Sequence, residues 1–508
     1  MTTPAPQIEY PENIDKAVLK IAGVVVIGMI MSILDITVVN VALPTFQKEF
    51  NVHSYATVAW AVTAYTLALA TVIPLTGWAA DRFGTKRLFI TALVLFTAGS
   101  VLCSTATDIN MLIGFRVLQG LGGGMLMPLG MTIMTRAAGP ARIGRLMAIL
   151  GVPMLLGPIA GPVLGGWLID SASWHWVFLI NVPLGAIAIV YAYLVLDKDN
   201  PEPSESFDFL GMALMSPGLA LFLYGVSSIP GEGTVTASKV WIPAVVGLAL
   251  IVTFVFHSFR PEHPLLDLRL FKNRNLAISI ITMFLFIMAF FGGLLLVPTY
   301  FQEVRGESVL KAGLLVAPQG IGAMLTMPIA GSLVDKMPVG RIVPFGLVTI
   351  VVGLFGLTHL TGDTPYWHVV AWLFIMGLGT GGTMMPLFTS ALKNLTHQEV
   401  ARGSTLLNVT QQISSSIGVA VMSVILTNHF KNSDLAYPAM AAIKDPSADH
   451  SAPNVVKGIA EAGAAFADTY WVALVLVALT LIPVYFLPRK REESRLLDDE
   501  DAPPVMVH

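Results

Sequence analysis

The feature that most restricts the fold of this chain is a succession of long apolar stretches. A helix needs about 20 consecutive apolar residues to cross the hydrocarbon core of a bilayer, and fourteen such stretches follow one another between residues 18 and 488. Only 12% of the 508 residues are charged, whereas a soluble domain is roughly a quarter charged. The sequence therefore predicts an all-α integral membrane protein in the lipid bilayer, with 14 transmembrane helices.

The composition and the motifs exclude several function classes. A net charge of −3 gives no electrostatic footprint for a nucleic acid. The single cysteine, Cys103, excludes a disulfide framework and a cysteine-based zinc site. The chain has no phosphate-binding G-x-x-x-x-G-K-S/T pattern, no H-E-x-x-H and no G-x-S-x-G. We therefore expect no cofactor, no bound metal and no enzyme activity.

Lysine and arginine are distributed unevenly among the loops. With the N-terminus placed in the cytoplasm, 21 of the 29 basic residues fall on the cytoplasmic side, seven fall outside, and Arg116 lies within a span. Basic loops are retained in the cytoplasm when a membrane protein inserts. This distribution predicts that both termini are cytoplasmic and that the number of spans is even.

An internal repeat predicts how the spans are grouped. The segment Gly77–Arg87 is similar to Gly331–Arg341 at an offset of 254 residues, and Gly120–Pro128 is similar to Gly377–Pro386 at an offset of 258. Two matches at nearly one offset indicate two six-helix bundles with two helices inserted between them. Parallel repeats of this kind are typical of transporters that bind substrate at the repeat interface and move by alternating access.

The repeat also sets the expected domain boundaries. The linker should carry the two inserted helices and an amphipathic inner-face helix over 261–275, and the second bundle should include a long outer loop over 428–467. We expect a tail over 1–17, the first bundle over 18–196, the linker over 197–275, the second bundle over 276–488 and a second tail over 489–508.

Two ionisable residues lie within the predicted spans at similar depth. Asp35 is in the first span and Arg116 is in the fourth. A carboxylate in hydrocarbon costs several kcal/mol unless it is paired, solvated or protonated, and intramembrane ionisable residues usually serve function. We interpret Asp35 and Arg116 as the proton-coupling residues, and a static buried ion pair is the alternative. The second bundle has no acid or base at the corresponding positions.

Three further groups of residues are candidates for function. The loop after the second span combines one acid with several bases, which predicts a conformational latch. The alternative is that the bases only set the orientation of the chain in the membrane. The fifth span combines prolines with glycines, which predicts a hinge or simply close helix packing. Polar, aromatic and methionine side chains suit an apolar substrate cavity. The predicted latch is Gly77, Asp81, Arg82, Gly84, Lys86, Arg87 and Asp335; the predicted hinge is Pro153, Gly157, Pro158, Gly161 and Pro162; the predicted cavity is Asn40, Tyr65, Gln119, Met288, Phe291, Gln319, Gln411 and Gln412.

Taken together, these motifs resemble the major facilitator superfamily, and within it the fourteen-helix drug:proton antiporters. The resemblance is carried by Leu34–Pro44, Gly77–Arg87, Leu112–Gly120 and Gly151–Gly166. It implies export of small hydrophobic or amphiphilic, often cationic, compounds in exchange for protons across a bacterial cytoplasmic membrane, with the chain acting as a monomer. Export of a lipid or a dedicated metabolite by the same machine is the alternative. A channel or a non-transporting scaffold is the more distant alternative function, because the chain has an internal repeat and few intramembrane charges.

Overall fold

The computed structural model describes residues 14–52, 55–138, 142–199, 206–232, 234–393, 395–396, 399–445 and 447–490. Within the helices, the side chains of residues 55–56, 152–156, 158–159, 162 and 230 are outside the described set. Most of the two expected tails, 1–13 and 491–508, is also outside it.

The described chain is built from helices, and no strand occurs among its described residues. The first half contains α1 (Lys16–Glu49), α2 (Tyr55–Phe83), α3 (Thr85–Ser104), α4 (Ile109–Ala138), α5 (Ile143–Ser171), the short α6 (Trp176–Leu179) and α7 (Asn181–Val195). The inserted segment contains α8 (Phe209–Ser227), the short α9 (Ile229–Glu232) and α10 (Ser238–Ser258). The second half contains the 3₁₀ helix η1 (Leu268–Lys272), α11 (Arg274–Glu303), α12 (Val309–Lys336), α13 (Val339–Leu357), α14 (Tyr366–Lys393), α15 (Val400–Lys431), α16 (Ala436–Lys444) and α17 (Pro453–Val484).

The helices form because apolar runs in a membrane must satisfy their backbone hydrogen bonds internally. Among the described residues, thirteen helical segments, one of which joins α6 and α7, are long and apolar enough to span a bilayer. Helix α5 is 29 residues long and is not among them, and several of its side chains are outside the described set. The all-α membrane architecture is confirmed, and the count of fourteen spans stays a prediction.

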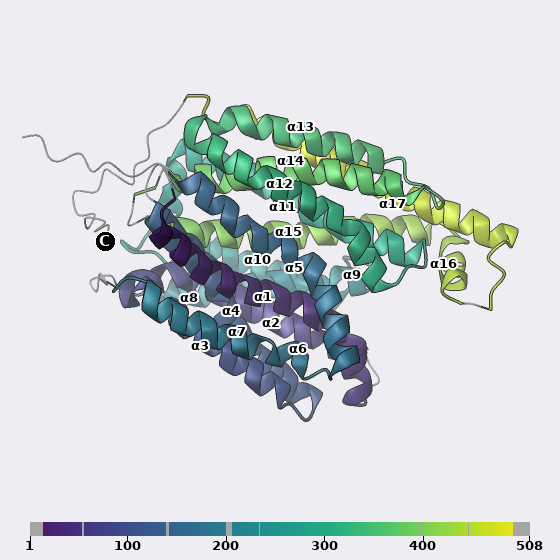
Figure 1. The fold of residues 1–508 in the computed structure, drawn as a ribbon, viewed down its shortest axis with the longest axis horizontal. Coiled ribbons are helices and arrows are strands. Elements are labelled where there is room, and N and C mark those ends of the chain that lie inside the picture. The colour runs from purple at the N-terminus through teal and green to yellow at the C-terminus, as the bar shows by residue number, and fades with distance from the viewer. Residues whose placement is uncertain are drawn as a thin grey trace, which may run out of the picture.

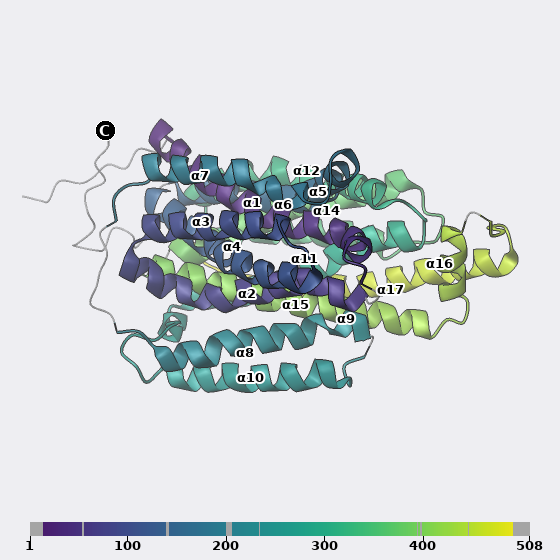
Figure 2. The same ribbon diagram turned by 90° about the horizontal axis from the view of Figure 1, so that it is seen from below.

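The helix pairings repeat between the two halves. In the first half α2 and α3 pack on α4, α1 packs on α5, and α7 packs on α1 and α3. The second half has the same pairings, with α12 and α13 on α14, α11 on α15, and α17 on α11 and α13. The inserted helices α8 and α10 pack on each other, and α8 also contacts α2 and α15 (Figure 2). This arrangement confirms two six-helix bundles with two inserted helices.

Two segments differ from the sequence-based expectation. The region 428–467 is mostly helical, because α15 continues to Lys431, α16 follows, and α17 begins at Pro453 and runs without a break through the expected last span. Pro453 is tolerated there because the first helical turn needs no partner for its backbone nitrogen. The expected amphipathic helix over 261–275 is wrong, since the segment contains only the five residues of η1 and the first two residues of α11 in helical form.

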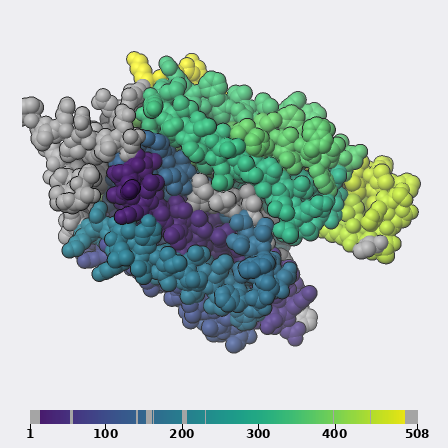
Figure 3. All heavy atoms as spheres, in the orientation of Figure 1, coloured from purple at the N-terminus to yellow at the C-terminus, as the bar shows by residue number. Residues whose placement is uncertain are grey.

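The two halves meet at one end of the bundle and separate toward the other. We call the end where α1 begins and α17 ends the terminal end, and the end that carries α16 the opposite end (Figure 1). The interface between the halves is formed by α5 with α12 and α14, and by α15 with α2 and α4. In the space-filling view the halves diverge toward the opposite end (Figure 3).

Candidate functional site

The predicted contact between Asp35 and Arg116 is confirmed. Arg116 on α4 donates from Nη1 to Oδ2 of Asp35 on α1, and neither side chain is exposed to solvent. The two residues meet because α1 and α4 pack on each other within the first half. A buried carboxylate is retained only with close hydrogen-bonded partners, since taking an ion out of water costs several kcal/mol.

The second carboxylate oxygen of Asp35 is held by two amides. Gln119 donates from Nε2 to Oδ1 of Asp35 at 2.7 Å, and Asn181 donates from Nδ2 to the same oxygen at 3.1 Å. Gln119 accepts from Nη1 of Arg116 at 2.7 Å through its Oε1. Both amides also donate to Oγ of Ser100, at 2.7 Å from Gln119 and 3.3 Å from Asn181. The carboxylate of Asp35 therefore faces three donors, which suits its ionised form.

Arg116 is held on its other sides by α2. Its Nε donates to the carbonyl oxygen of Ala61 at 2.8 Å, and its Cζ lies 4.1 Å from the ring centroid of Tyr65. The Tyr65 hydroxyl in turn lies 2.9 Å from Oγ of Ser32. Tyr65 and Gln119 are both fully buried in this network. They were predicted to line a substrate cavity, and the structure instead places them around the ion pair.

Asn181 and Ser100 are the members of this site that the sequence did not predict. Asn181 is the first residue of α7, and Ser100 lies on α3. Both are almost completely buried. Their only mark in the sequence is that they are neutral polar residues within apolar spans, and many other serines and asparagines share that mark. Only the packing of α3 and α7 against α1 and α4 shows which of them reach Asp35.

The predicted latch residues join the two halves at the terminal end. Asp81 on α2 lies 3.6 Å from Nη2 of Arg136 on α4 and 3.7 Å from Nε of Arg402 on α15. Asp335 on α12 accepts from Nε of Arg145 on α5 at 3.1 Å. The carboxylates of Asp81 and Asp335 therefore each reach a base of the other half, as a latch requires.

Backbone contacts reinforce these ion pairs at the same end. Asp335 also accepts from the backbone N–H of Gly144 at 2.9 Å. A Cβ at Gly144 would overlap the carbonyl oxygen of Gly331, and a Cβ at Gly77 would lie 3.1 Å from Oγ1 of Thr405. Glycine is needed at Gly144 because the two helices approach through their backbones. The halves are therefore in direct contact at the terminal end.

The remaining residues of the predicted latch act within the first half. Lys86 donates from Nζ to the carbonyl oxygens of Tyr193 and Leu196 at the end of α7. Gly84 has a φ of 92°, which favours glycine, and the carboxylate of Asp199 accepts from the N–H groups of Lys86 and Arg87 at 2.8 and 2.9 Å. The side chains of Arg82 and Arg87 are exposed. These contacts anchor α3 to the end of α7 rather than to the second half.

At the terminal end of α1, Asp15 connects two turns of the first half. It caps α1 by accepting from the N–H of Val18 at 2.8 Å, and it pairs with Nη1 of Arg142 at 3.3 Å. The Val18 hydrogen bond, assisted by Arg142, lowers the pKa of Asp15 below its ordinary value, against the opposing effect of burial. This contact joins the start of α1 to the turn before α5.

Helix α5 is continuous from Ile143 to Ser171, and its glycines Gly157, Gly161 and Gly165 face α1. A Cβ at Gly157 would overlap Ile33, and a Cβ at Gly161 would overlap Thr37. The hydroxyl of Thr37 donates to the carbonyl oxygen of Gly157 at 3.1 Å. Close packing thus accounts for both glycines. The side chains of Pro153, Pro158 and Pro162 are outside the described set, and the hinge stays a prediction.

The other predicted cavity residues are spread over both halves. Asn40 on α1 is exposed, while Met288 and Phe291 on α11 and Gln411 and Gln412 on α15 are half-buried. Gln319 on α12 is only 4% exposed. Neither the predicted cavity nor its lining is tested by these placements, and the set stays a prediction.

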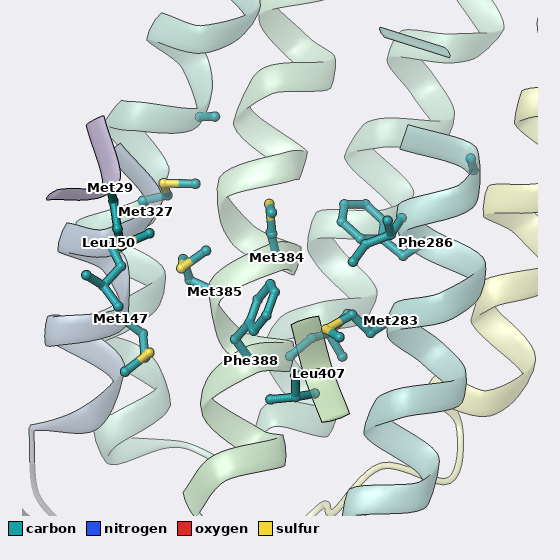
Figure 4. Close-up of a cluster of buried hydrophobic side chains, with 14 of the residues drawn as sticks. Met29, Met147, Leu150, Met283, Phe286, Met327, Met384, Met385, Phe388 and Leu407 are labelled. Atoms are coloured by element: carbon teal, nitrogen blue, oxygen red, sulfur yellow. The ribbon is translucent and has the colours of Figure 1, made fainter. Parts of the chain in front are cut away.

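A methionine-rich cluster fills the interface between the two halves. Side chains from α1, α5, α11, α12, α14 and α15 meet there (Figure 4). A Cβ at Gly151 of α5 would touch Met327 of α12 and Met385 of α14, and Asn408 of α15 lies 3.3 Å from the sulfur of Met131 on α4. The labelled members are Met29, Met147, Leu150, Met283, Phe286, Met327, Met384, Met385, Phe388 and Leu407.

Comparison with known proteins agrees with this architecture. The sequence model of the Major Facilitator Superfamily matches residues 25–419. The chain belongs to the major facilitator superfamily. It is 46% identical over 507 residues to the Multidrug resistance protein B homolog of Mycobacterium tuberculosis (strain ATCC 25618 / H37Rv), covering 96% of this chain and 93% of the relative. It is 31% identical over 400 residues to the Multidrug export protein EmrB of Escherichia coli (strain K12), covering 78% of each chain.

A solved structure shows the same fold. The proton:xylose symporter XylE is similar with a TM-score of 0.60, although only 15% of residues are identical, and the match covers 94% of this chain and 98% of XylE. At this identity the likeness concerns the fold alone. Membership of the superfamily identifies the chain as a multi-pass membrane transporter rather than an enzyme.

Proposed function

We propose that this chain is a proton-coupled antiporter that exports small hydrophobic compounds across a bacterial cytoplasmic membrane, acting as a monomer. Its relatives named above are a multidrug resistance protein homolog and a multidrug export protein. The observation that carries the proton coupling is the buried pair of Asp35 and Arg116, which meet without solvent exposure inside the first half. Because such a pair is costly to bury, its retention within a span favours a functional role.

In this proposal the terminal end is cytoplasmic, as the distribution of Lys and Arg predicts. The described conformation, which is closed at that end, then corresponds to the outward-facing state. Substrate has left toward the outside, and ionised Asp35 with its three donors awaits a proton. The acid and its base neutralise each other in this state.

Protonation of Asp35 changes what its neighbours contact. The acid can no longer accept all three donors, because one carboxyl oxygen becomes a donor itself. The Arg116 charge is then left without its counter-charge inside the membrane, which raises the free energy of the outward-facing arrangement. A conformation that gives water access to Arg116, or that releases the proton to the cytoplasm, then becomes favoured. The halves reach it by rocking about their interface.

The latch sets the equilibrium between the two states. The ion pairs of Asp81 with Arg402 and of Asp335 with Arg145 connect the halves only when the terminal end is closed. They therefore favour the outward-facing state, and they must separate when the chain opens to the cytoplasm. We infer that protonation of Asp35 and opening of the latch both shift the equilibrium away from the outward-facing state.

The test is transport by purified protein in proteoliposomes with an imposed pH gradient and a panel of hydrophobic dyes. The wild type and Asp445→Asn, which removes an exposed acid of the outer surface, should move dye against its gradient. Asp35→Asn should insert normally and lose gradient-driven transport. Undiminished transport by Asp35→Asn would remove Asp35 from the mechanism.

A further inference from the structure

The second half contains a counterpart of the ion-pair site, and its polar group has no partner. A Cβ at Gly120 of α4 would overlap the carbonyl oxygen of Tyr65 on α2, and a Cβ at Gly377 of α14 would overlap the carbonyl oxygen of Gln319 on α12. Gln319 and Gly377 follow Tyr65 and Gly120 by 254 and 257 residues, which is the spacing of the internal repeat. Gln319 therefore occupies on α12 the place that Tyr65 occupies on α2.

The surroundings of the two positions differ in charge. Tyr65 covers the guanidinium of Arg116 and contacts Ser32. The positions of the second half that correspond to Arg116 are the apolar Leu373 and Phe374. The sequence has no Asp, Glu, Lys, Arg or His at residues 280–298 of α11, 314–332 of α12, 371–390 of α14 or 405–427 of α15. The interior of the second half is therefore free of formal charge at this depth.

Gln319 is buried without a hydrogen-bond partner for either end of its amide. Its side chain is 4% exposed, and neither its Oε1 nor its Nε2 has a hydrogen-bond partner among the described residues. Leaving a buried donor and acceptor unpaired is costly, so each such group in a native protein calls for an explanation. An amide that is unpaired in one state is explained if a ligand pairs with it in the transport cycle.

Gln319 lies between the methionine-rich cluster and the opposite end. Helix α12 packs on α5 of the first half, and Met327 of α12 is part of the closing cluster (Figure 4). Gln319 is eight residues, about 12 Å along the helix axis, from Met327 toward the opposite end, where the halves diverge. A compound that has passed the methionine cluster would therefore reach the level of this amide.

We propose that Gln319 is the hydrogen-bonding anchor of the substrate, and that the substrate is an uncharged apolar compound carrying a neighbouring donor and acceptor, such as a carboxamide. The amide of Gln319 supplies one acceptor and one donor, which match the N–H and C=O of a carboxamide. A permanent cation finds no counter-charge at this depth of the second half, and Asp35 is occupied by Arg116, Gln119 and Asn181. This proposal rests on the proposed function, whose substrate class it narrows.

The proposal is tested by binding to the full chain in lipid nanodiscs, which does not depend on proton coupling. Three fluorescent probes share one ring system: 1-pyrenecarboxamide, 1-ethylpyrene and trimethyl(1-pyrenylmethyl)ammonium. The wild type should bind the carboxamide about tenfold more tightly than 1-ethylpyrene, which corresponds to one hydrogen-bonded pair. Gln319→Met should abolish this preference. Gln302→Leu, at the end of α11, should keep it.

Two further measurements make the test decisive. Gln319→Met should unfold at or above the wild-type temperature, since replacing an unpaired buried amide by an apolar group of similar shape is neutral or stabilising. Gln319→Glu should gain affinity for the ammonium probe. The proposal is overturned if Gln319→Met retains the carboxamide preference, if it lowers the unfolding temperature, or if the wild type binds the ammonium probe as tightly as the carboxamide. Carboxamide binding without proton-driven transport would instead contradict the proposed function alone.

Discussion

Removing the Asn181 amide is expected to destabilise the ion-pair site by the free energy of one hydrogen bond. Asn181 donates to the same oxygen of Asp35 as Gln119 does, at 3.1 Å against 2.7 Å for Gln119. A hydrogen bond to a charged group contributes about 1.5–3 kcal/mol, and its greater length places the Asn181 bond at the lower end of that range. Asn181→Ala should therefore lower the free energy of unfolding by about 1.5 kcal/mol.

The loss is expected because the buried carboxylate of Asp35 then keeps only Arg116 and Gln119 as donors. The assay is the thermal unfolding of the purified protein in detergent. Ser100→Ala is the matched control, because Ser100 lies in the same network but donates no hydrogen bond to Asp35. A wild-type unfolding temperature in Asn181→Ala would refute the assignment.

Three further perturbations test other parts of the structure. Arg116→Met should destabilise the protein by about 3–5 kcal/mol because it leaves a buried charge unpaired, and adding Asp35→Asn in the same chain should recover most of the thermal stability measured in detergent. Gly161→Ala should cost about 1–3 kcal/mol, because the added methyl group overlaps Thr37; an unchanged unfolding temperature would show that α1 and α5 can separate freely. Asp335→Asn should weaken the contact between α12 and α5 and lengthen spin-label distances across the terminal end, and an unaltered distance distribution would argue against a latch.

The architecture could be predicted from the sequence because the signals behind it are long. Runs of about 20 apolar residues specify spans, and two motif matches at nearly one offset specify the halves. The pairing of Asp35 with Arg116 could also be predicted, since each is the rare ionisable residue of its span and their depths agree. Burial in hydrocarbon leaves such residues few alternatives to each other.

The rest of the site depends on which faces of the helices meet. Gln119 is one turn from Arg116 on the same face of α4, so it joins the ion pair rather than a cavity. Tyr65 is placed on Arg116 by the packing of α2 against α4. Asn181 reaches Asp35 only because α7 packs against both α1 and α3. Sequence periodicity does not distinguish these contacts from contacts with lipid.

The outer segment 428–467 shows a second limit of prediction from the sequence. Residues 453–467 are less apolar than the span that follows, and the sequence therefore predicts that they lie in an outer loop. Helix α17 is continuous because nothing in the segment breaks a helix after Pro453, and α16 packs against its added turns. Hydropathy marks where a helix can meet lipid, and it does not mark where the helix ends.

The most direct test of the central claim is to measure proton movement and substrate movement in the same vesicles. Proteoliposomes loaded with substrate and a pH-sensitive dye, with no imposed pH gradient, should acidify inside as substrate leaves through the wild-type protein, because antiport carries protons inward in exchange. Asp35→Asn should still exchange labelled for unlabelled substrate, and should move no protons with it. Proton movement that persists in Asp35→Asn at the wild-type ratio to substrate would contradict the account.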